Sequence, residues 1–216
     1  MRHLAIIADG NQRWAASQNR PKEAVGHAQG LNVIERCCEW AISRDVKMLT
    51  VYCFSTENWG RESGEVDHIM DLARWYFQER REWYTSRGIR VRFAGRRDRL
   101  SADLVKSMSV MEEETRGCNT LTLTICADYG GHDAIARAVQ GGARTVCELD
   151  EALTAEIPTP DAILRTGGEM RLSNFLLWQA AYAELFFSPT MFSALEDSEL
   201  DALSEEYSTR TRKFGV

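Results

Sequence analysis

The stretch HLAIIADGNQRWA (residues 3–15) places a short apolar run directly before a cluster of polar and charged side chains. Its first six residues have the length and composition of a buried β-strand. A glycine after such a strand lets backbone N–H groups approach a phosphate closely, and Arg13 can add a charge-assisted contact. Asp9 is itself an anion, so beside a phosphate it would hold a Mg²⁺ that bridges to the phosphate oxygens. The alternative is an ordinary turn over Asp9, Gly10 and Asn11.

Further strand-like runs follow along the chain and alternate with longer helix-like segments. The predicted strands cover 3–8, 48–54, 89–95, 120–127 and 161–166, and the predicted helices cover 28–44, 63–86, 101–116, 131–147 and 197–210. The glycine pair at 141–142 weakens one of these helices. This rhythm predicts an α/β fold, with a mostly parallel central sheet that has helices on both faces. No repeat or linker interrupts it, so residues 1–216 are expected to form one domain.

Composition narrows the class of protein. The chain has 216 residues, 44% hydrophobic and 27% charged, as in an ordinary globular domain. A net charge of −6 argues against a nucleic-acid partner, because no broad excess of Lys and Arg is present to neutralise phosphates. The six cysteines form no CxxC pair, which indicates buried thiols in a reducing compartment. No segment resembles a signal peptide or reaches about 20 apolar residues, so we expect a cytoplasmic protein.

Two more polar clusters come at the ends of predicted strands, where a parallel sheet binds ligands. FSTENWGR (54–61) follows the second strand, and the alternative for it is helix N-capping chemistry. RTGGEMRLS (165–173) follows the fifth strand, and its Arg165, Arg171 and Ser173 suit a diphosphate clamp. Here the alternative is a set of surface ion pairs. Glu169 and Glu184 are candidates for holding a metal or orienting the arginines.

The third cluster continues into a strongly apolar run, NFLLWQAAYAELFF (174–187). Charged clamps beside apolar segments suit a ligand that is an anion at one end and hydrocarbon at the other. No GxxxxGK[ST] loop or GxGxxG turn is present, so a nucleotide-binding protein or a phosphatase is a weaker alternative.

Taken together, the motifs resemble those of the cis-prenyltransferases, the undecaprenyl diphosphate synthase family. The segments that carry the resemblance are HLAIIADGNQRWA, GHAQG (26–30), STENWGR, DYGGHDAI (128–135), RTGGEMRLSNFLLWQAAYAE and the terminal RTRKFG (210–215). They occur in the family's order and cover nearly the whole chain. The resemblance implies a sheet with a hydrophobic tunnel. It also implies condensation of an allylic diphosphate with isopentenyl diphosphate, with a cis double bond formed at each addition.

The same resemblance implies roles for particular residues. Asp9, Asn58 and Arg61 would be catalytic, and Asp9 and Glu184 would be associated with Mg²⁺. The substrate-binding set would be Gly10, Asn11, Gln12, Arg13, Trp14, His27, Ser55, Glu57, Trp59, Arg165, Arg171 and Ser173. The family works as a homodimer, which would bring Arg210, Arg212 and Gly215 toward the neighbouring site. The lipid product implies a possible peripheral contact with membranes.

The chain also departs from the family's pattern. Ala8 replaces a usual Met, Gln12 a Gly in the phosphate loop, Lys22 an Arg and Asp128 an Asn. The bulky rings at 75–77 suggest a tunnel floor, whereas Cys53 stands where short-chain relatives have a larger residue. We therefore expect a medium-to-long polyprenyl product, with a short-chain or branched product as the alternative. A non-catalytic partner subunit is a further alternative, although such chains tend to lose the first-loop Asp or the Arg pair.

Overall fold

The sheet that the sequence predicts is present in a computed structural model, which describes residues 1–19 and 22–211 and, within 22–25, the backbone only. Six strands pair in parallel in the order β3-β4-β2-β1-β5-β6. They are β1 His3–Ile7, β2 Met48–Ser55, β3 Ile89–Ala94, β4 Leu121–Tyr129, β5 Ala162–Arg165 and β6 Glu184–Phe187. Their carboxyl ends all lie at one edge of the sheet, which positions the loops that carry the polar clusters.

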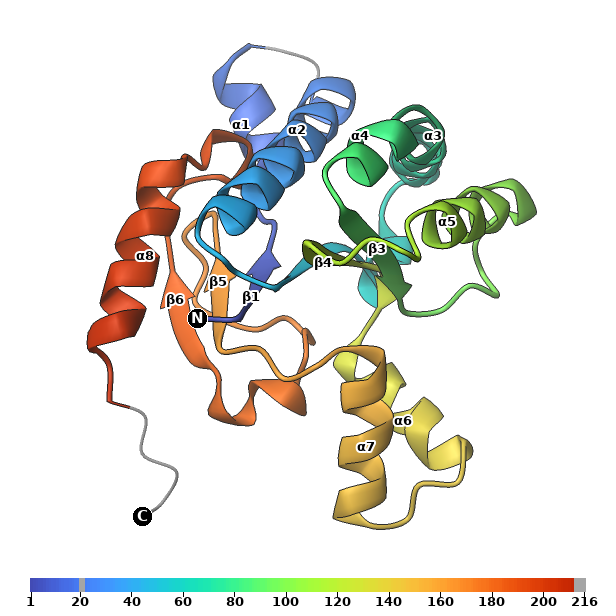
Figure 1. Cartoon of the computed structure of the whole chain (residues 1–216). Coiled ribbons are helices and arrows are strands. Elements are labelled where there is room, and N and C mark those ends of the chain that lie inside the picture. Colours follow the sequence, from blue (N-terminus) through green and yellow to red (C-terminus); the bar gives the residue numbers. More distant parts are fainter. Residues whose placement is uncertain (20–21, 212–216) are drawn as a thin grey trace.

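Helices cover both faces of this sheet (Figure 1). They are α1 Asn11–Ser17, α2 Lys22–Ser43, α3 Ser63–Glu79, α4 Arg81–Ser86, α5 Ala102–Glu114, α6 Gly131–Gln140, α7 Val146–Glu156 and α8 Asp197–Thr209. Three short 3₁₀ turns join them, η1 Thr56–Gly60, η2 Gln179–Tyr182 and η3 Phe192–Ala194. None of the helices in the described part of the chain is long and apolar enough to cross a membrane.

Strand β1 lies near the middle of the sheet and is buried along its whole length. Leu4 and Ile6 belong to one hydrophobic cluster, whereas Ala5 and Ile7 belong to another. Side chains alternate between the two faces of a strand, so each cluster marks one face. A strand covered on both faces carries an unbroken apolar run, which explains why HLAII lacks an apolar–polar alternation.

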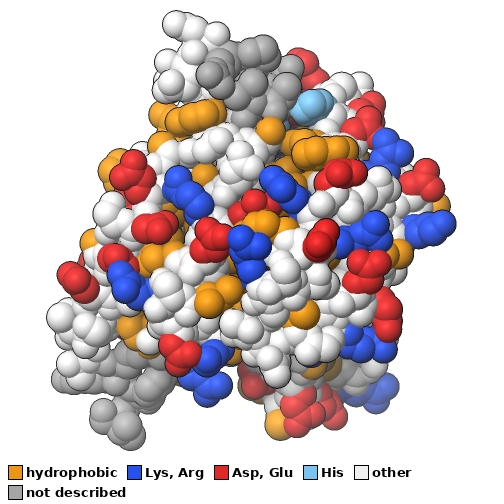
Figure 2. Space-filling view, turned by 45° about the horizontal axis from the view of Figure 1, so that its top comes forward, with side chains coloured by type: hydrophobic (Ala, Val, Ile, Leu, Met, Phe, Trp, Pro, Cys, Tyr) orange, Lys and Arg blue, Asp and Glu red, His pale blue; other side chains and the backbone are white. Residues whose placement is uncertain are grey.

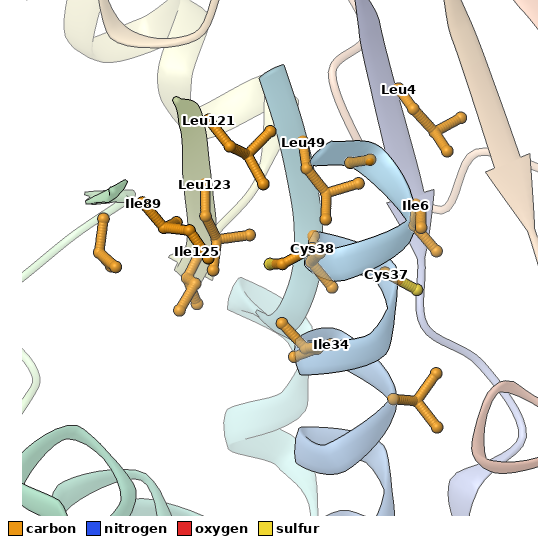
Figure 3. Packing of buried hydrophobic residues seen from close by; sticks show 14 of the residues in the cluster. Leu4, Ile6, Ile34, Cys37, Cys38, Leu49, Ile89, Leu121, Leu123 and Ile125 are labelled. Carbon is orange, nitrogen blue, oxygen red and sulfur yellow. The ribbon is translucent and has the colours of Figure 1, made fainter. Parts of the chain in front are cut away.

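The larger cluster lies between the sheet and α2, α3, α5 and α8. Figure 3 shows Ile34, Cys37 and Cys38 of α2 directed toward Leu49 and neighbouring strand residues. Burial raises the pKa of the Cys37 thiol to about 12, so this sulfur packs as a small apolar group. The opposite face is covered by α6, α7 and the segment after β5, where the rings of Phe175 and Tyr52 stack with centroids 4.6 Å apart.

Several element boundaries differ from the sequence-based prediction. The helix predicted over 63–86 is two helices, because α3 ends before Arg80 and α4 begins after it. The helix predicted over 131–147 is also wrong, since α6 ends at the glycine pair and Gly142 has a φ of 108°. The sequence prediction lacked α1, α7 and β6. Strand β6 has only four residues inside a long apolar run, which gives periodicity too little length to act on.

His3 supports a prediction about stability at low pH. Its ring is 1% exposed, with Nε2 2.8 Å from the Thr50 hydroxyl and Nδ1 3.3 Å from the Thr159 carbonyl oxygen. Burial lowers the pKa of this ring from 6.5 to about 4, so the folded protein keeps it neutral. The unfolded chain binds the proton at a higher pH. The free energy of unfolding should therefore fall as the pH drops from about 6.5 toward 4, by roughly 3 kcal/mol from this group.

Urea unfolding of the wild-type protein and of His3→Gln, at pH 7 and at pH 4.5, measures this term. The variant lacks the titrating group, so its stability should change less between the two pH values. Equal pH dependence in the two proteins would show that the ring does not act in this way.

Candidate active site

The loop after β1 holds the first polar cluster in a constrained backbone. Gly10 has a φ of 100°, and a Cβ at this position would lie 2.9 Å from the Cβ of Met191. Glycine is therefore required here, both for its backbone angle and for its size. Helix α1 begins at the next residue, Asn11, and no side chain caps its first turn. The backbone N–H groups of a first helical turn suit an anion.

The loop after β5 lies against this first loop because β5 pairs with β1. Gly167 has a φ of 84°, and a Cβ there would come within 2.7 Å of an Arg13 guanidinium nitrogen. The backbone N–H of Asp9 donates to the Thr166 hydroxyl at 3.0 Å. Two clusters separated by about 150 residues are thereby joined, as their positions at strand ends predicted.

Asp9 lies between two arginines. Its Oδ1 is 3.2 Å from Arg13 and its Oδ2 is 2.8 Å from Arg165. Arg165 is only 4% exposed and also donates to the Ser173 hydroxyl at 2.7 Å and the Arg171 carbonyl at 2.6 Å. Arg165 therefore holds both loops together, and its buried Nε has no hydrogen-bond partner among the described residues. The sequence hypothesis treated it as an open clamp like Arg171, which the burial of its side chain does not favour.

The cluster after β2 forms the turn η1. Ser55 and Asn58 make a reciprocal capping box, in which the Asn58 side chain accepts from the Ser55 N–H at 3.0 Å. The capping alternative is therefore present in the structure, and Asn58 is not among the residues that line the cavities described below. Arg61 leaves the turn and pairs with Glu65, which also accepts from the Gln12 side chain at 2.6 Å.

Two connected cavities open at this edge of the sheet. A polar one of about 160 Å³ is lined by the loop 8–13 together with His27, Cys53, Arg61 and Ile69. An apolar one of about 100 Å³ extends from it between the sheet and α2, α3 and α5, as far as Phe77 and Met108. The two share five lining residues, namely Ala8, Asn11, His27, Cys53 and Ile69. The polar cavity therefore adjoins the apolar cavity at these residues.

Cys53 stands where the two cavities meet. Its exposed surface faces the cavities rather than the outer surface, and surrounding protein raises the pKa of its thiol to about 12. The thiol is neutral at physiological pH, so it extends the apolar lining. Figure 2 views the molecule with the end that carries α1 turned forward, and acidic and basic side chains alternate there with apolar ones between them.

Other residues of the predicted set lie further out. Arg171 is exposed and pairs with Glu169, and Glu57 accepts from Asn174 at 2.7 Å. Trp14 and Trp59 line neither cavity. The side chain of Lys22, and all of Arg212 and Gly215, lie outside the described residues. Arg210 contacts its own chain, over the Phe186 ring at 4.0 Å.

Glu184 does not join Asp9 within one chain, contrary to the predicted metal pair. Glu184 is level with Ala162 in the sheet, whereas Ile7, two residues before Asp9, is level with Arg165. That separates Glu184 from Ile7 by about 10 Å along the strands, and Asp9 lies beyond Ile7. Glu184 accepts instead from Arg210 at 2.8 Å. The sequence hypothesis missed this because strand β6, and so its register, was not predicted.

A metal in this site would need ligands from a substrate. Within the part of the chain that the structure describes, no group of three His, Cys, Asp or Glu side chains could hold a metal ion. Mg²⁺ is often bound through one or two carboxylates plus substrate phosphates rather than by a cage of protein ligands. A single carboxylate, Asp9, lines the polar cavity, and it fits that mode of binding.

Comparison with known proteins identifies the family. The family profile described as "Putative undecaprenyl diphosphate synthase" matches residues 7–215. The chain belongs to the undecaprenyl diphosphate synthase family. This cis-prenyltransferase is 44% identical to an isoprenyl transferase of Aquifex pyrophilus, over 99% of this chain and 95% of that protein. It is 40% identical to a ditrans,polycis-undecaprenyl-diphosphate synthase of Xanthomonas axonopodis pv. citri specific for (2E,6E)-farnesyl diphosphate, over 100% and 88%.

Solved structures agree with this assignment to the cis-prenyltransferases. Lavandulyl diphosphate synthase from Lavandula x intermedia, in complex with dimethylallyl diphosphate, superposes with a TM-score of 0.92 at 30% identity, covering 100% of this chain and 98% of that one. A probable undecaprenyl diphosphate synthase from Campylobacter jejuni gives 0.85 at 31%, covering 100% and 99%. The α/β fold that the sequence predicted is therefore confirmed.

Sequence reasoning missed three residues that organise the site. The Thr166 hydroxyl joins the loops after β1 and β5. Glu65 contacts both Arg61 and Gln12. Asp128 accepts a hydrogen bond from the Trp59 indole at 2.9 Å. Thr166 and Glu65 carry no sequence signal, since a buried Thr and a helical Glu are ordinary. Asp128 does carry one, because it departs from the family's pattern.

Proposed function

We propose that this cis-prenyltransferase adds isopentenyl units to an allylic diphosphate whose hydrocarbon tail lies in the apolar cavity. The continuity of the polar chamber with the apolar slot carries the proposal. A diphosphate at the loop 9–13 would leave the tail pointing toward Phe77. Each CH₂ buried there contributes roughly 0.8 kcal/mol to binding.

The allylic diphosphate is supported by the chemistry of the first loop. Arg13 and the uncapped first turn of α1 offer a charge and N–H donors to the leaving group. Breaking the allylic C–O bond moves negative charge onto the diphosphate, so fixed donors at this point stabilise the charge as it develops. His27 is one of the residues that line both the polar and the apolar cavity.

Isopentenyl diphosphate is placed on the neighbouring loop, by Arg171 with Ser173. The Arg171 side chain is 59% exposed, which leaves it open to a phosphate. Arg165, buried beneath, holds the Ser173 hydroxyl and Asp9 in position. Two substrates held side by side gain from proximity, and the carbon–carbon bond then forms as the proton leaves the alkene. Arg61, at the wall of the polar cavity, would help to position the alkene.

We include Mg²⁺ as the cofactor, held by Asp9 together with diphosphate oxygens. A bound Mg²⁺ supplies charge that favours departure of the diphosphate. The two arginines beside Asp9 keep its carboxylate oriented toward the polar cavity. Glu184 is not part of this proposal within one chain.

A medium-to-long polyprenyl product is the first candidate, supported by the small, uncharged Cys53 at the cavity junction. A short or branched product is the second. It is favoured by the high structural likeness to lavandulyl diphosphate synthase and by the small volume of the apolar cavity, about 100 Å³. Phe77, not the 53% exposed Trp75, contributes to the floor that the rings at 75–77 suggested.

Sizing the products separates these candidates. The protein is incubated with Mg²⁺, isopentenyl diphosphate and a C5, C10 or C15 allylic primer, and the products are resolved by chain length. We expect regular elongation from the C15 primer. Products that stop after one addition, or a branched C10 product from the C5 primer alone, would establish the second candidate. No transfer with any primer would contradict both and favour the partner-subunit alternative.

We also propose that the protein is a cytoplasmic homodimer that contacts membranes peripherally through its lipid product. All six cysteines are free, which suits a reducing compartment.

Strand β6 is an edge strand, and near it Met170, Tyr182 and Leu185 are exposed at 78%, 66% and 37%. An exposed apolar edge of this kind is typical of an interface. Sedimentation equilibrium at micromolar concentration should give the mass of two chains, and a single-chain mass would exclude the dimer.

A further inference from the structure

Strands β2 and β4 depart from regular pairing beside the cavity junction. The register passes from Tyr52–Cys126 to Phe54–Ala127 and then to Ser55–Tyr129. Cys53 therefore has no partner on β4, and Asp128 has none on β2. Consecutive strand residues normally face opposite sides, yet Cys53 and Phe54 both line the apolar cavity. Paired bulges thus shape the cavity wall at the point where the polar chamber opens into it.

Asp128 lies at the second of these bulges in a left-handed conformation, with a φ of 52°. Its side chain is fully buried, and its carboxylate accepts from the Trp59 indole at 2.9 Å and from Arg99 Nε at 2.9 Å. A second Arg99 nitrogen completes a two-point contact. A buried charge is favourable only when it is paired and fully hydrogen-bonded, and both conditions are met here.

The partners of Asp128 come from two other parts of the chain. Arg99 belongs to the loop between β3 and α5, whereas Trp59 belongs to η1, the turn that leads to Arg61. The Trp59 ring meets Phe54 edge-on, with centroids 5.3 Å apart. The Asp128 carboxylate therefore fixes η1, the turn that leads to Arg61 in the polar cavity. It also fixes the Trp59 ring, which supports Phe54 in the wall of the apolar cavity.

We propose that Asp128 is a positioning residue for prenyl transfer, whose buried carboxylate holds η1 and the cavity wall in their productive relation. It touches neither cavity, so it acts through Trp59 and Phe54. A leucine at this position would have a similar shape but no oxygen to accept from Trp59 or Arg99, so the clamp would be lost. The inference rests on the proposed placement of the prenyl chain in the apolar cavity.

Steady-state kinetics of Asp128→Leu tests the proposal. We expect kcat to fall about tenfold or more, because small misplacements of reacting groups have large effects on rate. The KM for isopentenyl diphosphate should stay near the wild-type value, since the loops around Asp9 and Arg171 are untouched. The matched control is Asp133→Leu, which removes another carboxylate held by two arginines, Arg96 and Arg137, in a helix outside the site. This control should lose some stability and keep its kcat.

Trp59→Phe is the test if Asp128→Leu does not fold. It keeps a ring against Phe54 and removes only the indole donor, so it should lower kcat in the same direction without raising KM. A folded Asp128→Leu with wild-type kcat, or failing that a Trp59→Phe with wild-type kcat, would overturn the positioning role. Assaying the wild-type protein under the same conditions distinguishes failure of this inference from failure of the proposed function. An inactive wild-type protein would contradict the proposed function itself.

Discussion

Asp9→Asn should lower kcat at least about a hundredfold, the size expected when one group that stabilises developing charge is lost. The change keeps the shape of the side chain and one acceptor for Arg165, but it removes the charge that would hold Mg²⁺ beside the diphosphate. Asp9→Ala should have an equal or larger effect on rate. It should also destabilise the fold by about 1–3 kcal/mol, because the buried Arg165 then loses its carboxylate partner. Rates from a radiolabelled isopentenyl diphosphate assay and urea unfolding check the two effects.

Asp201→Asn is the matched control for this experiment. Asp201 is held by Arg44 at 2.7 Å and by the Trp40 indole at 2.8 Å, between α8 and α2 and away from both cavities. Its loss should affect stability without affecting the rate of transfer. Near-normal turnover in Asp9→Asn would show that this carboxylate does not serve the metal.

Arg171→Ala should raise the KM for isopentenyl diphosphate by about 10- to 100-fold, with little change in kcat or in stability. The side chain is exposed and its partner Glu169 is also at the surface, so the fold does not depend on it. A charged hydrogen bond to a phosphate is worth roughly 1.5–3 kcal/mol, which corresponds to the predicted range. The KM for the allylic substrate should stay near the wild-type value, since that diphosphate lies on the other loop.

Arg116→Ala provides the comparison, because Arg116 is equally exposed and pairs with Glu113 far from the site. Arg171→Lys should recover part of the affinity, as a point charge replaces the guanidinium fork. If Arg171→Ala binds isopentenyl diphosphate as tightly as the wild-type protein, the second substrate is not held by this loop.

Much of the fold could be predicted from the sequence because five strands are either long or strongly apolar. HLAII and LTLTICADY are buried on both faces, and such runs need no partner to be recognised. Strand β6 and the register of Glu184 could not be predicted, since its four residues lie inside the long apolar run 174–187, which marks no strand boundary. The sequence hypothesis of an Asp9–Glu184 metal pair therefore could not take into account how far apart these two residues lie within one chain.

The placement of the polar clusters was predictable because strand ends in a parallel sheet share one edge. The role of each side chain within them was not. Arg165 and Arg171 look alike in sequence, yet one is 4% exposed and the other is open to solvent. Asn58 likewise acts as a helix cap, which a motif alone cannot distinguish from a contact with substrate. Burial and hydrogen bonding, which depend on residues far along the chain, decide such cases.

The central claim is that diphosphate heads and a prenyl tail occupy one continuous chamber, and that transfer takes place between them. The most direct measurement is the amount of inorganic pyrophosphate released per isopentenyl unit incorporated from farnesyl diphosphate, with Mg²⁺ and with the divalent cation removed by a chelator. We predict one pyrophosphate per unit in the presence of Mg²⁺, and neither release nor incorporation after chelation. Pyrophosphate released without incorporation, or incorporation that persists without a divalent cation, would contradict the account.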